Sequence, residues 1–167
     1  MKLYHGTCED CGYEIYQCGY LEPNPNPSKD NTTYFIDEMF KRYTGSNPRE
    51  NAVYFWDNIE STSGSDCVIK VKLENIDLSK LYVGDYDSVN ELYHHRDSNE
   101  LGGDMSEKEF NSICLHYINK YMDSFMPYEE YLKNKDSYLE KYAPEFLYFD
   151  DAKIEIEEDY LEYFDML

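Results

Sequence analysis

The segment PEFLYF, residues 144–149, is the part of the sequence that most directly decides the fold. Bulky apolar and aromatic side chains follow Glu145 without interruption, a composition typical of a strand inside a sheet. An apolar-rich stretch, residues 153–164, comes after it and predicts a last strand or helix. Further strand-forming segments are residues 1–5, 51–56 and 67–73. The sequence therefore predicts a β-sheet that includes a strand near the end of the chain.

Helices are predicted from apolar residues at helical spacing. Gly6 is expected to end the first strand, and Thr7 to cap a helix that Gly19 stops. Ser106 and Glu109 form a capping-box pattern at the start of a longer helix. The predicted helical segments are residues 8–18, 36–43, 106–121 and 127–141, and the polar stretch 86–105 is expected to be a loop. The predicted fold class is α+β, in a single domain that spans residues 1–167.

Charge and hydrophobicity argue against several classes of function. The chain has 35 Asp and Glu against 15 Lys and Arg, for a formal net charge of −20. No basic cluster is present, so direct nucleic-acid binding is not expected, because the phosphates would be repelled. No apolar run reaches the ~20 residues needed to span a bilayer, and no membrane role is expected. Five cysteines, an odd number, without a signal peptide indicate free thiols and a cytoplasmic location.

Four potential metal ligands lie close together near the N-terminus: His5, Cys8, Cys11 and Cys18. Together they could form a tetrahedral zinc site, although their spacing is not a standard one. The three cysteines also share one face of a predicted helix with Ile15, which favours small, buried core residues. We therefore predict no metal site.

Three short motifs carry the functional prediction. They are LYHGT at residues 3–7, AVYF at residues 52–55 and PEFLYF at residues 144–149, each on or beside a predicted strand. Taken together and in this order, they resemble the ADP-ribosyltransferase superfamily, in the branch with a His, Tyr, Glu triad to which the poly-ADP-ribose polymerases belong. The fold implied by this resemblance is an ADP-ribosyltransferase-like split mixed β-sheet with flanking helices.

The resemblance implies an NAD site with His5, Tyr54 and Glu145 as catalytic residues. Breaking the bond between nicotinamide and ribose gives the sugar oxocarbenium character, which the Glu145 carboxylate would stabilise. Tyr54 would stack on the positively charged nicotinamide ring, and His5 would hydrogen-bond a ribose hydroxyl. The backbone of Gly6 would hold the nicotinamide carboxamide. Taken singly, each side chain also fits a structural role, so the prediction depends on their order and spacing.

Two further positions complete the implied cofactor-binding set, Thr7 and Ser63. Thr7 follows Gly6 directly, and Ser63 comes a short distance after Tyr54, where enzymes of this branch often place a serine. Ala143 stands two residues before Glu145, where the arginine-modifying branch has Glu. The sequence therefore gives no support for arginine as the acceptor.

Two classes of function remain open from the sequence. The first is an NAD-dependent mono-ADP-ribosyltransferase that modifies a macromolecular target, expected to be a protein with a basic surface, in a toxin or a phage-borne effector. The alternative is a non-enzymatic, acidic inhibitor that mimics nucleic acid and binds a basic nuclease, CRISPR or restriction complex. Stoichiometric, salt-sensitive binding is the expected mark of the alternative.

Overall fold

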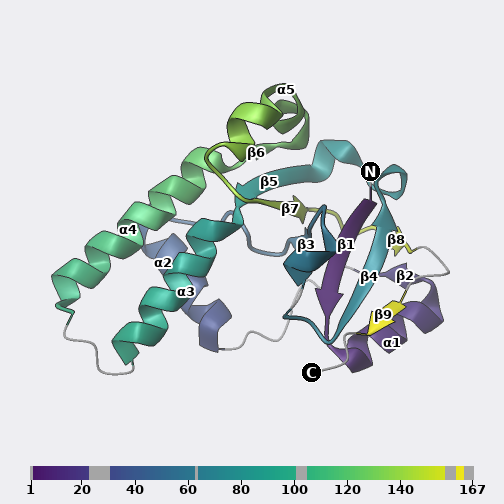
Figure 1. Ribbon diagram of the computed structural model, residues 1–167, viewed down its shortest axis with the longest axis horizontal. Coiled ribbons are helices and arrows are strands. Elements are labelled where there is room, and N and C mark those ends of the chain that lie inside the picture. The colour runs from purple at the N-terminus through teal and green to yellow at the C-terminus, as the bar shows by residue number, and fades with distance from the viewer. Residues whose placement is uncertain (1, 23–30, 63, 101–104, 157–160, 164–167) are drawn as a thin grey trace.

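The computed structural model describes residues 2–22, 31–62, 64–100, 105–156 and 161–163. Antiparallel sheets lie beside a group of helices, so the fold class is α+β, as predicted (Figure 1). The helices are α1 (Glu9–Cys18), α2 (Asn31–Thr44), α3 (Tyr86–Glu100), α4 (Glu107–Ser124) and α5 (Tyr128–Leu139). The strands are β1 (Lys2–Thr7), β2 (Tyr20–Leu21), β3 (Val53–Phe55), β4 (Cys67–Lys72), β5 (Leu81–Asp85), β6 (Met126–Pro127), β7 (Pro144–Tyr148), β8 (Ile154–Glu155) and β9 (Leu161–Tyr163). Within these residues, no helix combines the length and the apolar character needed to cross a membrane.

The first strand, β1, belongs to a three-stranded sheet in the order β1-β4-β9. β1 and β4 are antiparallel, with Gly6 opposite Val68 and Thr7 opposite Cys67. The prediction that the first strand ends at Gly6 is therefore wrong. The pairing with β4 keeps the backbone extended through Gly6 to Thr7, because a strand in a ladder is held by its neighbour as well as by its own side chains. Val68 and Cys67 have no exposed surface, so β4 is buried on both faces in this part.

The strand that holds the PEFLYF motif, β7, lies inside a four-stranded sheet in the order β3-β7-β5-β6. Phe146 of β7 pairs with Phe55 on one side and with Val83 on the other. All three side chains have no exposed surface, which confirms the predicted buried strand. The strand pairs among the described residues are antiparallel, so these residues do not show the parallel pairing that a mixed sheet would contain.

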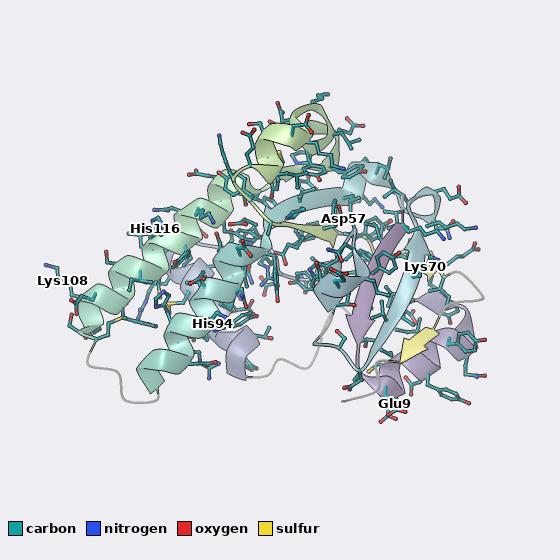
Figure 2. The ribbon with its side chains drawn as sticks, viewed as in Figure 1. Glu9, Asp57, Lys70, His94, Lys108 and His116 are labelled. Atoms are coloured by element: carbon teal, nitrogen blue, oxygen red, sulfur yellow. The ribbon has the colours of Figure 1, made fainter. Side chains whose placement is uncertain are left out.

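Helices α2, α3 and α4 pack together at one end of the molecule, away from the sheet that contains β1 (Figure 1). α4 begins at the predicted capping box, since the Ser106 side chain accepts the Glu109 N–H and the Glu109 carboxylate accepts the Ser106 N–H. Its inner stripe includes Cys114, Ile118 and Tyr121, which have no exposed surface, as the spacing predicted. Most of the outer side of α4 is polar, although Leu115 and Met122 are also exposed, and Figure 2 shows His116 on this side.

Helix α3 replaces most of the loop that the polar stretch 86–105 predicted, so that prediction is wrong. Val89 and Leu92 lie one turn apart on α3 and are fully buried against α2 and α4. The rest of α3 is polar, and its pattern carries little helical signal. Two buried side chains and the packing of a neighbouring helix stabilise a segment whose own sequence does not specify a helix.

Helix α1 lies against β4, but not by the face that the cysteine spacing predicted. Its N-cap is Cys8 rather than Thr7, and it ends at Gly19, where φ is +78°. The contact with β4 is made at Gly12, where a Cβ would lie 1.9 Å from the Cys67 sulfur. Cys8, Cys11 and Cys18 are exposed, so the prediction that they belong to the core is wrong. The close approach at Gly12 turns the cysteines of α1 toward solvent.

Candidate functional site

The candidate site lies where the sheets of β1 and β3 meet. A single bridge joins the two strands: the Tyr4 N–H donates to the Trp56 carbonyl at 2.8 Å, and the Trp56 N–H donates to the Tyr4 carbonyl at 2.9 Å. Beyond this isolated bridge, Nδ1 of the His5 ring lies 2.9 Å from the Tyr54 carbonyl oxygen. Where β1 and β3 separate, a hydrogen bond of the His5 side chain therefore replaces the backbone pairing between the two strands.

The hydrogen bond of His5 fixes the form of its ring. A carbonyl oxygen only accepts hydrogen bonds, so Nδ1 carries the proton in this contact. Burial lowers the pKa of His5 below its usual value, and the hydrogen bond to Tyr54 opposes this only in part. The neutral ring is therefore favoured, with Nδ1 as donor and Nε2 as acceptor.

The main chain of Gly6 faces the side on which β1 and β3 separate. Backbone groups of alternate residues in a strand point to the same side, and those of Tyr4 point to Trp56. The N–H and C=O of Gly6 therefore point past the end of the bridge. A Cβ at this position would lie 2.1 Å from Oγ of Ser65, so the adjacent loop leaves room only for glycine. Glycine at this position thus lets the Ser65 side chain pack directly against β1.

Glu145 begins the interior part of β7, opposite Gly84 of β5, and has no exposed surface. Its carboxylate accepts Nε–H of Arg49 at 2.9 Å and an Nη2–H of Arg49 at 3.0 Å. The Tyr121 hydroxyl of α4 donates to Oε1 of Glu145 at 2.9 Å. Paired N–H donors of this kind make the most specific arginine–carboxylate contact. The Glu145 carboxylate is therefore held in the interior by two side chains.

Arg49 connects Glu145 to Tyr54. Its guanidinium carbon lies 4.8 Å from the centre of the Tyr54 ring, and the Tyr54 hydroxyl donates to the Arg49 carbonyl at 2.8 Å. Burial disfavours the charged form of Arg49, but Glu145, Tyr54 and Tyr121 together outweigh burial and raise the pKa of Arg49 well above its ordinary value. Burial also raises the pKa of Tyr54 to about 12. A planar cation is thus held between a neutral aromatic ring and a carboxylate.

The backbone beside Arg49 is itself anchored. The Arg49 N–H donates to Oδ1 of Asn47 at 2.9 Å, and the Asn47 amide donates to Asp37 of α2. Both Asn47 and Asp37 are buried. Helix α2 therefore positions the segment that carries Arg49.

The structure brings His5, Tyr54 and Glu145 into one series of contacts, which passes through Arg49. Sequence reasoning missed Arg49 and Tyr121. The chain has only three arginines, and Arg49 lies just before the AVYF motif. The rarity of arginine and this position were the features of the sequence that could have indicated Arg49. Tyr121 is one of 19 tyrosines, and its place on a buried helical stripe did not distinguish it from a core residue.

The two remaining predicted positions are not part of this series. The methyl group of Thr7 lies 3.4 Å from where a Cβ of Gly12 would be, and its hydroxyl hydrogen-bonds the Cys8 thiol. Thr7 therefore contacts α1. Ser63 lies outside the described residues.

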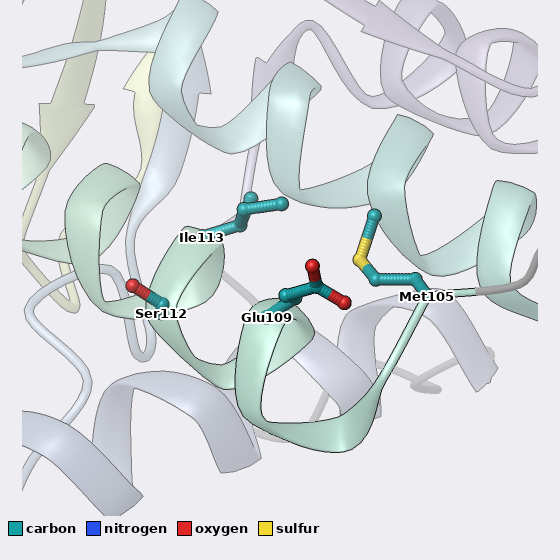
Figure 3. Close-up of a pocket in the computed structure, with 4 residues that line it drawn as sticks. All are labelled: Met105, Glu109, Ser112 and Ile113. Atoms are coloured by element: carbon teal, nitrogen blue, oxygen red, sulfur yellow. The ribbon is translucent and has the colours of Figure 1, made fainter.

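A hollow of about 440 Å³ opens at the start of α4 (Figure 3). Met105, Glu109, Ser112 and Ile113 line it. Tyr121, which contacts Glu145, lies beyond Ile113 on the same helix by about 12 Å, at a rise of about 1.5 Å per residue. The hollow is therefore separate from the candidate site.

Comparisons with protein-family models, with curated proteins and with solved structures find no match to this chain.

Proposed function

We propose that this protein is an NAD-dependent mono-ADP-ribosyltransferase that modifies a macromolecular target. The observation that carries the proposal is the series of contacts from His5 through Tyr54 and Arg49 to Glu145. These residues come from β1, β3, the segment before β3, and β7, and nothing in their local sequences requires them to meet. Their convergence supports a shared chemical role.

The residues around the separation of β1 and β3 fit the groups that NAD presents. Bound NAD would supply a ribose carbon whose bond to a cationic nicotinamide ring is ready to break. The Gly6 N–H and C=O match the acceptor and donor of a carboxamide, and Nε2 of His5 would accept a hydrogen bond from a ribose hydroxyl. The half-buried ring of Tyr54 already has a planar cation beside it, since the Arg49 guanidinium lies 4.8 Å from its centre.

In the structure, Arg49 occupies the position beside Glu145 that a ribose would need. Arg49 contacts both oxygens of Glu145, and Glu145 has no exposed surface, so a ribose gains access to that carboxylate only if Arg49 moves. We infer that Arg49 neutralises Glu145 in the resting protein. In the proposed reaction Glu145 would then stabilise the positive charge that develops on the sugar, as it now stabilises a guanidinium.

The proposed target is a protein with a basic surface, modified in the cytoplasm. The net charge of −20 favours such a partner, because opposite charges speed the encounter and like charges suppress it. The acceptor side chain is left open in the proposal.

The proposal is tested by incubating the purified full chain with NAD labelled on its adenine half and a lysate of its host. Label on discrete macromolecules and the release of free nicotinamide are measured together. We expect Glu145→Gln to lower both by about 10²–10³-fold, because one preorganised electrostatic contact to a reacting centre has roughly this effect. Gln keeps an acceptor for Tyr121 and for one N–H of Arg49, so this variant retains most of the local hydrogen bonding.

Two matched variants serve as controls. Glu155→Gln removes an exposed carboxylate on β8, and His116→Ala removes an exposed histidine on α4, whereas His5→Ala removes the proposed ribose contact. Circular dichroism establishes that each variant is folded. Equal turnover by the wild type and a folded Glu145→Gln variant would contradict the assigned role of Glu145.

A wild type that releases no nicotinamide, and whose melting temperature does not respond to NAD, would reject the enzymatic proposal. Capture of a basic partner in a fixed ratio, lost at high salt, would then support the acidic-inhibitor alternative.

A further inference from the structure

Two exposed cysteines stand together at the start of α1, outside the candidate site. Cys8 is the N-cap residue, with an extended backbone (φ −73°, ψ 161°), and Cys11 lies in the first turn. The Sγ atom of Cys8 accepts a hydrogen bond from the backbone N–H of Cys11 at 3.3 Å. Glu9 and Asp10 separate the two cysteines, and Figure 2 shows Glu9, the first residue of α1, at the lower edge of the molecule. The sequence is thus a Cys-x-x-Cys pair, with its first sulfur on the N-terminus of a helix.

The two thiols are chemically unequal. The Cys8 sulfur accepts hydrogen bonds from the Cys11 thiol, the Cys11 N–H and the Thr7 hydroxyl. These contacts lower the pKa of Cys8, the Cys11 thiol being the largest cause, although slight burial and the charge of Asp10 oppose them. The contact with Cys8 is also the largest cause that raises the pKa of Cys11. Cys8 is therefore the sulfur of the pair that ionises first.

We propose that Cys8 and Cys11 form a redox-active dithiol, in which Cys8 attacks an external disulfide and Cys11 resolves the product. The positive end of a helix favours a thiolate at its N-cap, and exposure gives a partner access to it. Cys11 is held beside Cys8, since its N–H donates to the Cys8 sulfur at 3.3 Å, so the second attack is intramolecular. Among the described residues, no three His, Cys, Asp or Glu side chains are grouped as metal ligands.

The reaction consists of two thiol–disulfide exchanges. In the first, the Cys8 thiolate bonds to one sulfur of R–S–S–R, the S–S bond breaks, and RS⁻ leaves and is protonated. In the second, Cys11 loses its proton and attacks the Cys8 sulfur, which releases the second RS⁻ to be protonated in turn. The protein dithiol is oxidised to the Cys8–Cys11 disulfide, and the external disulfide is reduced to two R–SH.

The other nearby cysteine of the fold, Cys67, is suited to a structural role. It has no exposed surface, and its thiol donates to the Cys8 carbonyl at 3.4 Å. Burial is the largest cause that raises the pKa of Cys67 to about 11, with the charges of Cys8 and Asp66 adding to it. Cys67 therefore stays a thiol, and it anchors the N-cap that positions Cys8.

The surroundings of the pair indicate which disulfides it accepts. A groove of about 350 Å³ lies beside Cys11, and it is also lined by Thr7, Glu14, Ile15, Cys18 and Glu22. Asp10 acts on the Cys8 sulfur and Glu14 on the Cys11 sulfur, while Glu9 and Asp66 act on the neighbouring Cys67. Anionic disulfides are repelled by such a surface and cationic ones are attracted. The substrate class we infer is a disulfide with positive charge beside the sulfur.

The test mixes the reduced full chain with cystamine, a dicationic disulfide, or with oxidised glutathione, which is anionic. Free thiols are then blocked with iodoacetamide, and the digest is analysed by mass spectrometry. We expect the wild type to form the Cys8–Cys11 disulfide, and Cys11→Ser to accumulate a mixed disulfide on Cys8. Cystamine should react at least about tenfold faster than oxidised glutathione at low salt, with a smaller ratio at high salt.

Cys8→Ser and Cys18→Ser are the variants matched to Cys11→Ser, because Cys11 and Cys18 are exposed on α1 and Cys8 is exposed at its N-cap. Cys8→Ser should form neither product, and Cys18→Ser should behave as the wild type. In the wild type, the alkylation of Cys8 should rise with pH with a midpoint below the ordinary 9.0 of a cysteine. The proposal is overturned if Cys18 is modified as fast as Cys8, or if folded Cys11→Ser traps no adduct on Cys8.

Discussion

Glu145 is a charged residue without exposed surface, and Arg49 and Tyr121 supply the donors that its carboxylate requires. A buried ion pair of this kind adds little net stability compared with apolar residues of the same volume, because both charges lose their hydration. Removing one partner is much more costly, since the other charge stays buried without its match. We therefore expect the largest effect of the pair on stability when one of the two residues is replaced and the other charge stays buried.

Arg49→Met should lower the free energy of unfolding by about 3–5 kcal/mol, measured by urea denaturation. The double variant Arg49→Met, Glu145→Leu should lose clearly less than the single one, because no unpaired charge remains inside. Arg42→Met is the matched control: Arg42 is exposed on α2, and its loss should cost no more than about 1 kcal/mol. Equal losses of unfolding free energy for Arg42→Met and Arg49→Met would refute the conclusion that the buried charge of Glu145 needs Arg49 as its partner.

At the scale of elements, α4 is fitted onto β5 through a close contact that places Tyr121 beside Glu145. Gly84 of β5 is opposite Glu145 of β7, and a Cβ at Gly84 would lie 2.5 Å from the Tyr121 hydroxyl oxygen. The missing side chain thus lets a tyrosine from a helix reach over one strand to a carboxylate on the next. The docking of α4 and the position of the candidate carboxylate depend on the same glycine.

Gly84→Ala should destabilise the protein by about 1–3 kcal/mol, because the added methyl group overpacks the contact between α4 and β5. Gly64→Ala is the control, since nothing lies within 4 Å of a Cβ at Gly64. That control should stay within about 0.5 kcal/mol of the wild type. Urea denaturation gives both values, and near-ultraviolet circular dichroism reports the tyrosine environment. If the two variants cost the same, the packing at Gly84 is not tight in solution.

The whole molecule carries 35 acidic against 15 basic residues, so repulsion among its own charges opposes the compact state. Local pairs offset this at single points, as where Lys80 lies 2.7 Å from Asp150. The amino group of Lys80 is the largest cause that lowers the pKa of Asp150, to about 2. The 15 basic side chains are too few to pair one to one with the 35 acidic ones.

The melting temperature should therefore rise when salt is added to a low-salt buffer. Most of the rise is expected below about 0.15 M, where the Debye length has fallen to about 8 Å. Differential scanning calorimetry over a NaCl series measures it, and sucrose at matched osmolality shows whether the effect is electrostatic. A melting temperature that falls with NaCl would mean that attractive pairs outweigh the net repulsion.

The sequence by itself determined the elements whose signals are local. The capping box of Ser106 and Glu109, the stop at Gly19 and the apolar run of β7 each specify an element through neighbouring residues, and all three are present in the structure. It also indicated His5, Tyr54 and Glu145 as a set, through the order of three motifs.

Only the tertiary structure decided which way these elements face. The exposure of the α1 cysteines follows from the contact at Gly12 with β4, and α3 is a helix because Val89 and Leu92 pack against α2 and α4. The partner of Glu145 is Arg49, 96 residues away in sequence. Such contacts join side chains with no shared local pattern, and their free energy exists only once the chain has folded. Periodicity and spacing in the sequence therefore predict helices and strands, whereas the contacts around the candidate site form only in the folded molecule.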